Sequence, residues 1–122
     1  MAITRSVALN ELPIRGLHVN SATASYTIVP SDSGIILFND YATATTYTLP
    51  TVGDAAGKWF WIVNGDTATS TVVAATTACI KGAHATAYTT LTSVAVGDHV
   101  ILTCDGTYYY IVSMGLLVWT LA

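Results

Sequence analysis

The three histidines and the two cysteines are the side chains with which this chain could hold a metal ion. Zinc sites use close pairs of such residues, in patterns such as Cys-x-x-Cys and His-x-x-x-His. Here His18, His84 and His99 lie far apart, and so do Cys79 and Cys104. The sequence therefore predicts no metal site and no cofactor. We interpret the two cysteines as small core residues, with pairing between them left open.

Asp98 directly precedes His99, and a carboxylate that orients an imidazole is one part of a Ser-His-Asp triad. Neighbours on a strand point to opposite faces, however, and the chain has no Gly-x-Ser-x-Gly nucleophile elbow. A glycosidase needs two carboxylates, yet Glu11 is the only glutamate and most aspartates occupy turn positions, where they accept hydrogen bonds from backbone amides. We therefore expect no enzymatic activity.

The run Trp59-Phe60-Trp61 allows two interpretations. On a strand, the two tryptophans share one face and Phe60 points to the other. The strand is either central and buried on both faces, or its tryptophans form an exposed platform that stacks on sugar rings. A sugar platform also needs a carboxylate nearby. The aspartates considered for that role are Asp32, Asp66 and Asp98.

Charged residues are scarce: they make up 9% of the 122 residues, against 52% apolar residues, and the net charge is −3. Soluble domains usually carry about a quarter of their residues charged. The deficit predicts one domain whose surface largely faces other protein chains, with an obligate oligomer as the simplest explanation.

Two other classes of partner are excluded by composition. The chain has only four basic residues, too few for a nucleic-acid footprint. No apolar run approaches the roughly 18 residues that span a bilayer, so we expect no membrane segment. The first eleven residues contain no continuous apolar stretch, which predicts no secretory signal and folding in a cytosol.

From residue 24 onward, short β-branched and aromatic runs alternate with turn residues, a pattern typical of all-β domains. We predict a compact antiparallel β-sandwich or barrel-like domain over residues 24–122, preceded by an extended N-terminal arm over residues 1–23. The expected strands are 25–29, 35–39, 45–49, 58–64, 71–75, 78–80, 88–91, 99–104, 107–112 and 116–121. The aromatic residues assigned to an interface or to the core are Trp59, Trp61, Tyr108, Tyr110 and Trp119.

Asp105-Gly106 predicts a β-hairpin, because Asp-Gly favours a two-residue type I′ turn. Such a turn pairs Leu102 with Tyr109 on one face and Ile101 with Tyr110 on the other. Neither face is polar. We therefore expect a sandwich core on one side of the hairpin and further protein on the other.

The segment 1–23 is too apolar for a solvated linker, yet Pro13 and Gly16 interrupt any strand alternation. Two arginines against one glutamate give it a net charge of +1, whereas two lysines against six aspartates give residues 24–122 a net charge of −4. We expect this arm to dock on an acidic neighbour or another subunit; the alternative is an ordinary first strand with a frayed start. The candidate contact residues are Arg5, Leu9, Leu12, Ile14, Arg15 and Leu17.

Four segments together resemble a small β-domain of virion proteins from tailed bacteriophages. They are SYTIVPSDSG (25–34), TYTLP (46–50), GKWFWIV (57–63) and GDHVILTCDGTYY (97–109), and the resemblance extends over residues 25 to about 115. The matching positions are mainly turn and core residues, so they imply a fold and carry over no catalytic or binding residue. The domain occurs in capsid decoration (cement) proteins and in head fibres and tail appendages. This chain has little besides the domain, which favours a compact decoration protein.

The resemblance implies a virion protein of the capsid surface, made in the bacterial host cytoplasm, that binds the major capsid protein as a homotrimer and stabilises the shell. The candidate contact residues would then touch the shell or a neighbouring subunit. The alternative is a receptor- or carbohydrate-binding head-fibre or tail appendage, with glycan stacked on the tryptophans. An enzyme ranks last, because it would need a pocket that gathers Asp98, His99 or another aspartate.

Overall fold

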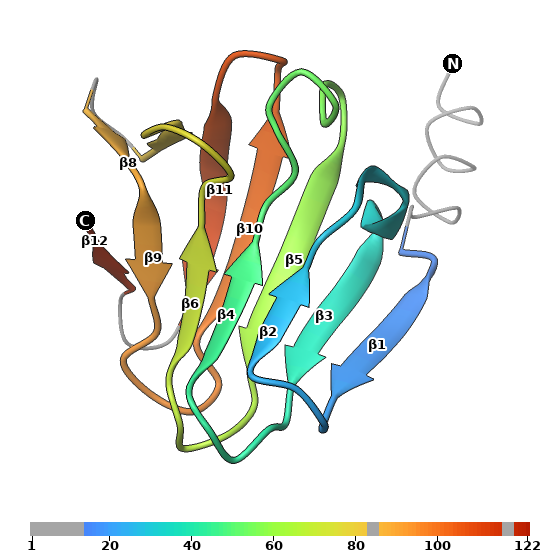
Figure 1. The fold of residues 1–122 in the computed structure, drawn as a ribbon, viewed down its shortest axis with the longest axis vertical. Coiled ribbons are helices and arrows are strands. Elements are labelled where there is room, and N and C mark those ends of the chain that lie inside the picture. Colours follow the sequence, from blue (N-terminus) through green and yellow to red (C-terminus); the bar gives the residue numbers. More distant parts are fainter. Residues whose placement is uncertain (1–13, 83–85, 116–118) are drawn as a thin grey trace, which may run out of the picture.

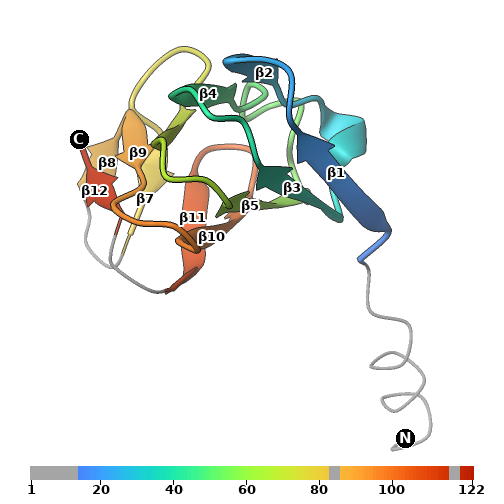
Figure 2. The same ribbon diagram turned by 90° about the horizontal axis from the view of Figure 1, so that it is seen from below.

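The computed structural model describes residues 14–82, 86–115 and 119–122. These residues form strands and a single short 3-10 turn, arranged as two sheets packed against each other, so the predicted all-β fold is confirmed (Figures 1 and 2). The elements are β1 (Gly16–Asn20), β2 (Ser25–Thr27), η1 (Pro30–Asp32), β3 (Ile35–Asn39), β4 (Thr45–Thr48), β5 (Trp59–Asn64), β6 (Ser70–Val73), β7 (Ile80–Lys81), β8 (Ala87–Tyr88), β9 (Thr90–Thr92), β10 (His99–Cys104), β11 (Tyr109–Gly115) and β12 (Thr120–Leu121).

The chain winds between the two sheets as a solenoid over its first half. Sheet A has the strand order β1-β3-β5-β10-β11-β7-β8, and sheet B has the order β12-β9-β6-β4-β2. Successive strands from β1 to β6 alternate between the sheets, and within each sheet they pair in parallel. Figure 2 shows the two layers end on, with β2 and β4 lying across from β1, β3 and β5.

The prediction of an antiparallel sandwich is wrong for this half of the chain. Antiparallel pairing holds for β10 with β5 and β11, for β9 with β6 and β12, and for β7 with β8. Consecutive strands pair as hairpins only where the connection is tight. Before β6 each connection instead carries the chain across to the opposite sheet. Strand alternation predicts which way a side chain faces, but it contains no information about which strand lies alongside.

The core lies between the inner faces of the two sheets. Every second residue of β4, β5, β6 and β10 is buried there, as are Leu37 and Asn39 of β3. Sheet A contributes Leu37, Phe60, Ile62, Val100, Leu102 and Tyr109, and sheet B contributes Tyr47, Val72 and Leu91. Trp119 joins this core, and its indole N–H donates to the His99 carbonyl at 3.0 Å. The interpretation of the cysteines is also confirmed: Cys79 and Cys104 are free and buried, and burial raises the pKa of both thiols.

A ladder of three asparagines closes one end of the core. Asn20, Asn39 and Asn64 end β1, β3 and β5 in register, and all three are buried. The Asn20 Nδ2 donates to Asn39 Oδ1 at 2.9 Å, and the Asn39 Nδ2 donates to Ser70 Oγ at 3.0 Å. The Ser70 hydroxyl in turn donates to Asn64 Oδ1 at 2.9 Å. These amides therefore satisfy one another where burial would otherwise be unfavourable.

The hairpin β10–β11 is confirmed, but its register differs from the predicted one. Cys104 pairs with Tyr109, and the turn is centred on Gly106 and Thr107, with Gly106 at φ +95°. Glycine at the first central position is typical of a type II′ turn. Asp105 sits one position earlier, and its carboxylate accepts hydrogen bonds from the turn. The shift of two residues keeps every side chain on its predicted face from the turn as far as the bulge between Ile101 and Leu102.

Acid is expected to weaken this turn. The Asp105 Oδ1 accepts hydrogen bonds from the N–H groups of Thr107 (2.8 Å) and Tyr108 (2.9 Å), which hold the pKa of that carboxyl below its ordinary value of 3.8. A pKa lowered on folding stabilises the protein above the unfolded pKa, and this stabilisation is lost as the pH falls through the folded pKa. Asp105→Asn keeps the hydrogen-bond acceptor but does not titrate. Between about pH 5 and about pH 2, its melting temperature should therefore fall less than that of the wild-type protein. Equal losses in both proteins would contradict this.

Part of the predicted arm belongs to the sheet. Gly16–Asn20 forms β1, which pairs in parallel with β3 at the edge of sheet A, as the alternative interpretation of a first strand expects. Arg15 fixes the start of this strand. Its backbone N–H donates to the Gly34 carbonyl at 2.7 Å, and its guanidinium donates to the carbonyls of Ser31 and Ser33. Arg15 is thus engaged within its own chain.

Candidate interaction surface

The outer faces of the two sheets differ in chemistry. On sheet B, residues with hydroxyl groups pair across all five strands in one row, and the hydroxyls of Thr71 and Thr92 lie 3.4 Å apart. The row consists of Ser25, Thr46, Thr71, Thr92 and Thr120. Hydroxyl groups hydrogen-bond to water readily, so this face suits contact with solvent.

The outer face of sheet A is apolar. Register places Leu17, Ile36, Trp61 and Ile101 in one row across β1, β3, β5 and β10, and Val19, Phe38, Val63 and His99 in the next. With Trp59 and Tyr110 these residues form what we call the apolar face, in which no residue is an Asp, Glu, Lys or Arg. Their side chains point outward because their neighbours Leu37, Phe60, Ile62, Val100 and Leu102 point into the core.

Solvent reaches this face in the single chain. Leu17 and Val19, on the edge strand β1, are 60% and 45% exposed, and the other members of the apolar face are partly exposed. Free strand edges are often protected by lysine, by another charged residue or by proline, and β1 contains none of these. The expectation that β5 is buried on both faces therefore does not hold within one chain. On the outer side of the hairpin Ile101 pairs with Ser113 and His99 with Gly115, so the expectation of apolar pairs on both sides of β10 and β11 holds only in part.

Two glycines leave room for aromatic rings of the apolar face. A Cβ on Gly65 would overlap the Phe38 ring and lie 2.9 Å from the Asn39 carbonyl oxygen. A Cβ on Gly115, which pairs with His99 across β10 and β11, would overlap the imidazole. The His99 ring lies in turn 6.5 Å from the Trp61 ring, centroid to centroid. The face is thus built from rings held in defined positions.

Substituting Gly65 with alanine should distort this surface. The added methyl group has to displace both the Phe38 ring and backbone, which for overpacked sites costs about 1–3 kcal/mol of folding free energy. Gly16→Ala is the matched control, because no heavy atom lies within 4 Å of the added Cβ. Chemical denaturation of both variants measures the difference, and equal stabilities would show that the Phe38 ring does not rest on Gly65.

Trp61 is poorly satisfied in the single chain. Its indole nitrogen is covered from solvent and finds no hydrogen-bond partner among the described residues. A buried unpaired donor typically destabilises a fold by about 1–3 kcal/mol. Trp59, on the same face, has its backbone N–H bonded to the Ser33 hydroxyl at 3.1 Å. Both tryptophans are therefore placed by the fold on a surface rather than in the core, unlike Trp119.

Polar groups gather at one border of the apolar face. The Lys81 ammonium lies 3.8 Å from the centre of the Tyr108 ring, a cation–π contact. The Tyr108 and Tyr110 rings meet edge to face at 6.2 Å, and the Tyr110 hydroxyl donates to Asp105 Oδ2 at 3.1 Å. The aromatic centre thus has a polar margin, the composition that protein interfaces share.

The candidate contact residues of the N-terminal segment lie in different surroundings. Ile14 is 43% exposed, and Leu17 belongs to the apolar face. Arg15 is engaged by the carbonyls described above. Arg5, Leu9 and Leu12 lie outside the described residues.

Each aspartate considered for a sugar platform accepts hydrogen bonds from its own turn or loop. Asp98 is buried, and its Oδ2 accepts hydrogen bonds from the N–H groups of Val94 and Ala95. Asp32 binds the Val29 N–H and the Tyr26 hydroxyl, and Asp66 binds the Ala68 N–H. None of these contacts involves Trp59 or Trp61. Asp98 and His99 also separate as expected, since Asp98 is buried while His99 lies on the apolar face.

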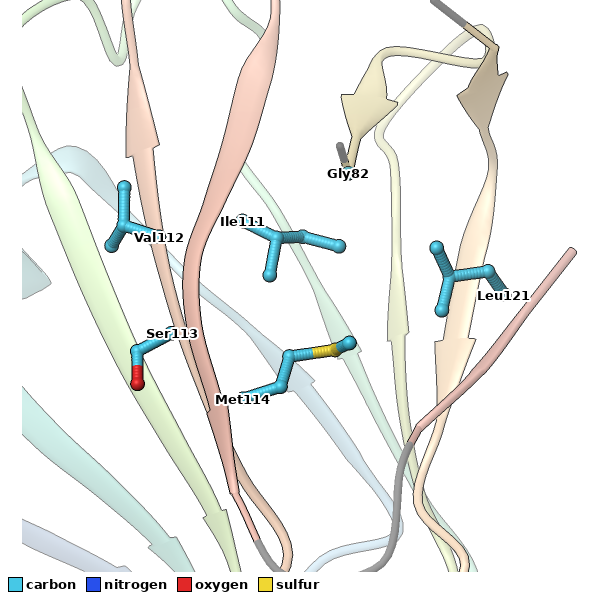
Figure 3. A pocket seen from close by; sticks show the side chains of 6 residues that line it. All are labelled: Gly82, Ile111, Val112, Ser113, Met114 and Leu121. Carbon is cyan, nitrogen blue, oxygen red and sulfur yellow. The ribbon is translucent and has the colours of Figure 1, made fainter. Parts of the chain in front are cut away.

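A second apolar feature lies where β11 passes beyond its short partner β7. Figure 3 shows side chains from β11 and β12 bordering a groove of about 280 Å³. Its lining residues are Gly82, Ile111, Val112, Ser113, Met114 and Leu121. The lining has no titratable group, so the groove offers hydrophobic contact and no acid–base chemistry. Sequence reasoning missed it, because the groove depends on β7 being two residues long.

Within the described ranges, no group of three or more His, Cys, Asp or Glu side chains is placed to hold a metal ion. His18 lies near Tyr26 on the β1 side and His99 on the apolar face, while His84 lies outside the described residues. Among the residues described there is no helix with the length and apolar character needed to cross a membrane. The chain matches no protein-family model, and no curated protein shows significant similarity to it.

Proposed function

We propose that this protein is a capsid decoration protein of a tailed bacteriophage, which binds the outer surface of the shell as an oligomer and stabilises it. The observation that carries the proposal is the apolar face of sheet A, a surface without charges on a chain whose charged residues amount to 9%. Such a surface suits protein contact more than catalysis or solvent. The resemblance of residues 25–115 to virion β-domains supplies the phage setting. The protein would be made in the host cytoplasm and act on the virion.

Multivalent binding gives this role its physical basis. Once one subunit of an oligomer docks on the shell, the others bind at high local concentration, which raises avidity by about two to four orders of magnitude. Weak contacts per subunit then suffice. Because the bound protein favours the assembled shell over separated capsomers, it raises the free energy needed to pull capsomers apart.

Adding the purified protein back to capsids that lack it tests the proposal. We expect the protein to co-sediment with the shells and to raise the temperature or pressure at which they break. An unrelated globular protein at the same concentration controls for crowding. Shells that neither bind the protein nor gain resistance would overturn the proposal.

The N-terminal segment is the part of the chain that we propose contacts the shell. Because Gly16–Asn20 is part of sheet A, the deletion that tests this has to end before Ile14. Removing residues 1–13 should leave a folded oligomer whose capsid binding falls at least tenfold. Unchanged binding by the shortened chain would contradict this role.

Glycan binding by a receptor-binding appendage is the second candidate, favoured by Trp59 and Trp61 lying together on an outward face. The engaged aspartates weigh against it, since a sugar site needs polar partners beside its aromatic platform. Binding to host-surface glycans that is lost in Trp59→Ala would favour this candidate over decoration.

A further inference from the structure

We infer that the apolar face of sheet A is the contact between copies of this chain. The inference rests on the proposed function in one respect, that the protein works as an oligomer, for which the resemblance implies a trimer. It assigns separate surfaces to separate tasks: sheet A to self-association, and the N-terminal segment to the shell.

The size of the face calls for a partner. The four strands β1, β3, β5 and β10 that carry its two rows lie about 4.8 Å apart and are about five residues long at about 3.3 Å per residue, so the face projects onto about 300 Å². Protruding Trp, Phe and Leu side chains add to the accessible area. Monomers rarely expose contiguous apolar patches above a few hundred Å², and a standard interface buries about 800 Å² per partner. The face is therefore of a size to form the apolar centre of an interface, which its polar margin would complete.

The difference between the two outer faces indicates which of them meets another copy. The outer row of sheet B consists of hydroxyl residues, whereas the equivalent rows of sheet A are aliphatic and aromatic. A domain with one polar and one apolar outer face reaches its lowest free energy when the apolar faces meet and the polar faces remain in water. Copies that turn these sheets toward one another satisfy this for every subunit at once.

The chemistry of the face also permits copies of one chain to meet. The chain is acidic overall, so contact between copies through charged surfaces would be repulsive. None of the residues of the apolar face is an Asp, Glu, Lys or Arg, and Lys81 lies only at its margin. Copies can therefore meet here without pairing like charges.

The partner that covers the apolar face has to be available before the protein meets a capsid. A decoration protein is free in the cytoplasm until it meets an assembled capsid, and a monomer with this face uncovered would aggregate. Only another copy of the chain is always available at that stage. Self-association thus keeps the free protein soluble.

Light scattering of the full-length protein tests the inference. We expect the trimer mass, three times the 12.8 kDa of one chain. Trp61→Lys places a charge in the middle of the face and should reduce the mass to that of one chain. Leu17→Lys should lower the mass as well, and because Leu17 is 60% exposed its folding should be unaffected. Thr71→Lys, on the outer face of sheet B, is the matched control and should keep the trimer mass.

Each opposite result is decisive. If Trp61→Lys and Leu17→Lys both kept the trimer mass, the inference would be overturned, because the interface would then lie elsewhere. A wild-type mass of 12.8 kDa would also overturn it. In that case, tryptophans shielded from a soluble quencher in the free chain would point to residues 1–13 as the cover, and tryptophans shielded only on capsids would point to the shell. A trimer that responds to the lysines but ignores capsids would keep this inference and overturn the proposed function.

Discussion

Phe60→Ala is expected to destabilise the protein by about 3–5 kcal/mol, the range for removing a fully buried aromatic ring. Phe60 has no exposed surface and packs 6.3 Å from the Tyr109 ring, centroid to centroid, between the two sheets. The substitution leaves a cavity that rigid strands cannot close. Urea denaturation followed by circular dichroism measures the loss, which should be the same at every protein concentration.

Trp61→Ala is the matched comparison, because Trp61 follows Phe60 in the same strand and points to the opposite side. Its removal should leave the folded single chain close to wild-type stability but weaken association between chains. The loss should therefore be largest in concentrated protein and shrink as the protein is diluted, since stability gained from association depends on concentration. Two variants with equal, concentration-independent losses would contradict the separation of β5 into a core face and a contact face.

Asn39→Ala should have the second-largest effect, although it removes no apolar surface. Asn39 is fully buried, accepts from Asn20 Nδ2 and the Tyr47 hydroxyl, and donates to Ser70. Alanine removes one hydrogen-bond partner from each of these buried groups, at about 1–3 kcal/mol for each group left unsatisfied. We expect the melting temperature to fall by roughly 10–20 °C.

Thr43→Ala is the control for Asn39→Ala, because Thr43 is exposed in the loop that follows β3. Its melting temperature should remain within a few degrees of wild type, as for most surface substitutions. If Asn39→Ala melted at the same temperature as Thr43→Ala, the asparagine ladder would contribute nothing to stability. The pKa of Tyr47, which burial raises to about 12, gives an independent check that its hydroxyl stays within the core.

The strands themselves were predictable from the sequence, because β-branched and aromatic residues alternate over short runs that glycine and proline bound. The runs 35–39 and 99–104 match β3 and β10 residue for residue. The inward and outward sides were predictable for the same reason, since alternation has a period of two. The glycine and aspartate of the hairpin were also identified, although the turn is centred one position later than expected.

The parallel pairing was not predictable from these local patterns. Strand neighbours depend on where each connection leads, and residues 28–34 are equally compatible with a turn back along the same sheet and with a crossing to the other. Ladders such as Asn20, Asn39 and Asn64 were a usable signal, because stacked positions in a solenoid repeat at similar spacing. The second interval of this ladder is longer than the first, however, and this uneven spacing hides the repeat.

The apolar face was anticipated only in part. Sequence alternation indicated apolar residues on both sides of β5, β10 and β11, and hence further protein on one side. It gave no indication that Leu17 and Ile36 extend the same surface, because that requires β1 and β3 to lie parallel beside β5. Pairing partners decide which separate apolar runs merge into one surface.

Quenching of tryptophan fluorescence by acrylamide tests most directly whether the apolar face is covered in the native protein. The chain has three tryptophans, and Trp119 is buried in the core at 2% exposure, so quenching reports on Trp59 and Trp61. We expect weak quenching of the wild-type protein that increases on dilution, as copies separate and expose the face. Strong quenching that is already complete in concentrated protein would show that water, and not another chain, covers sheet A.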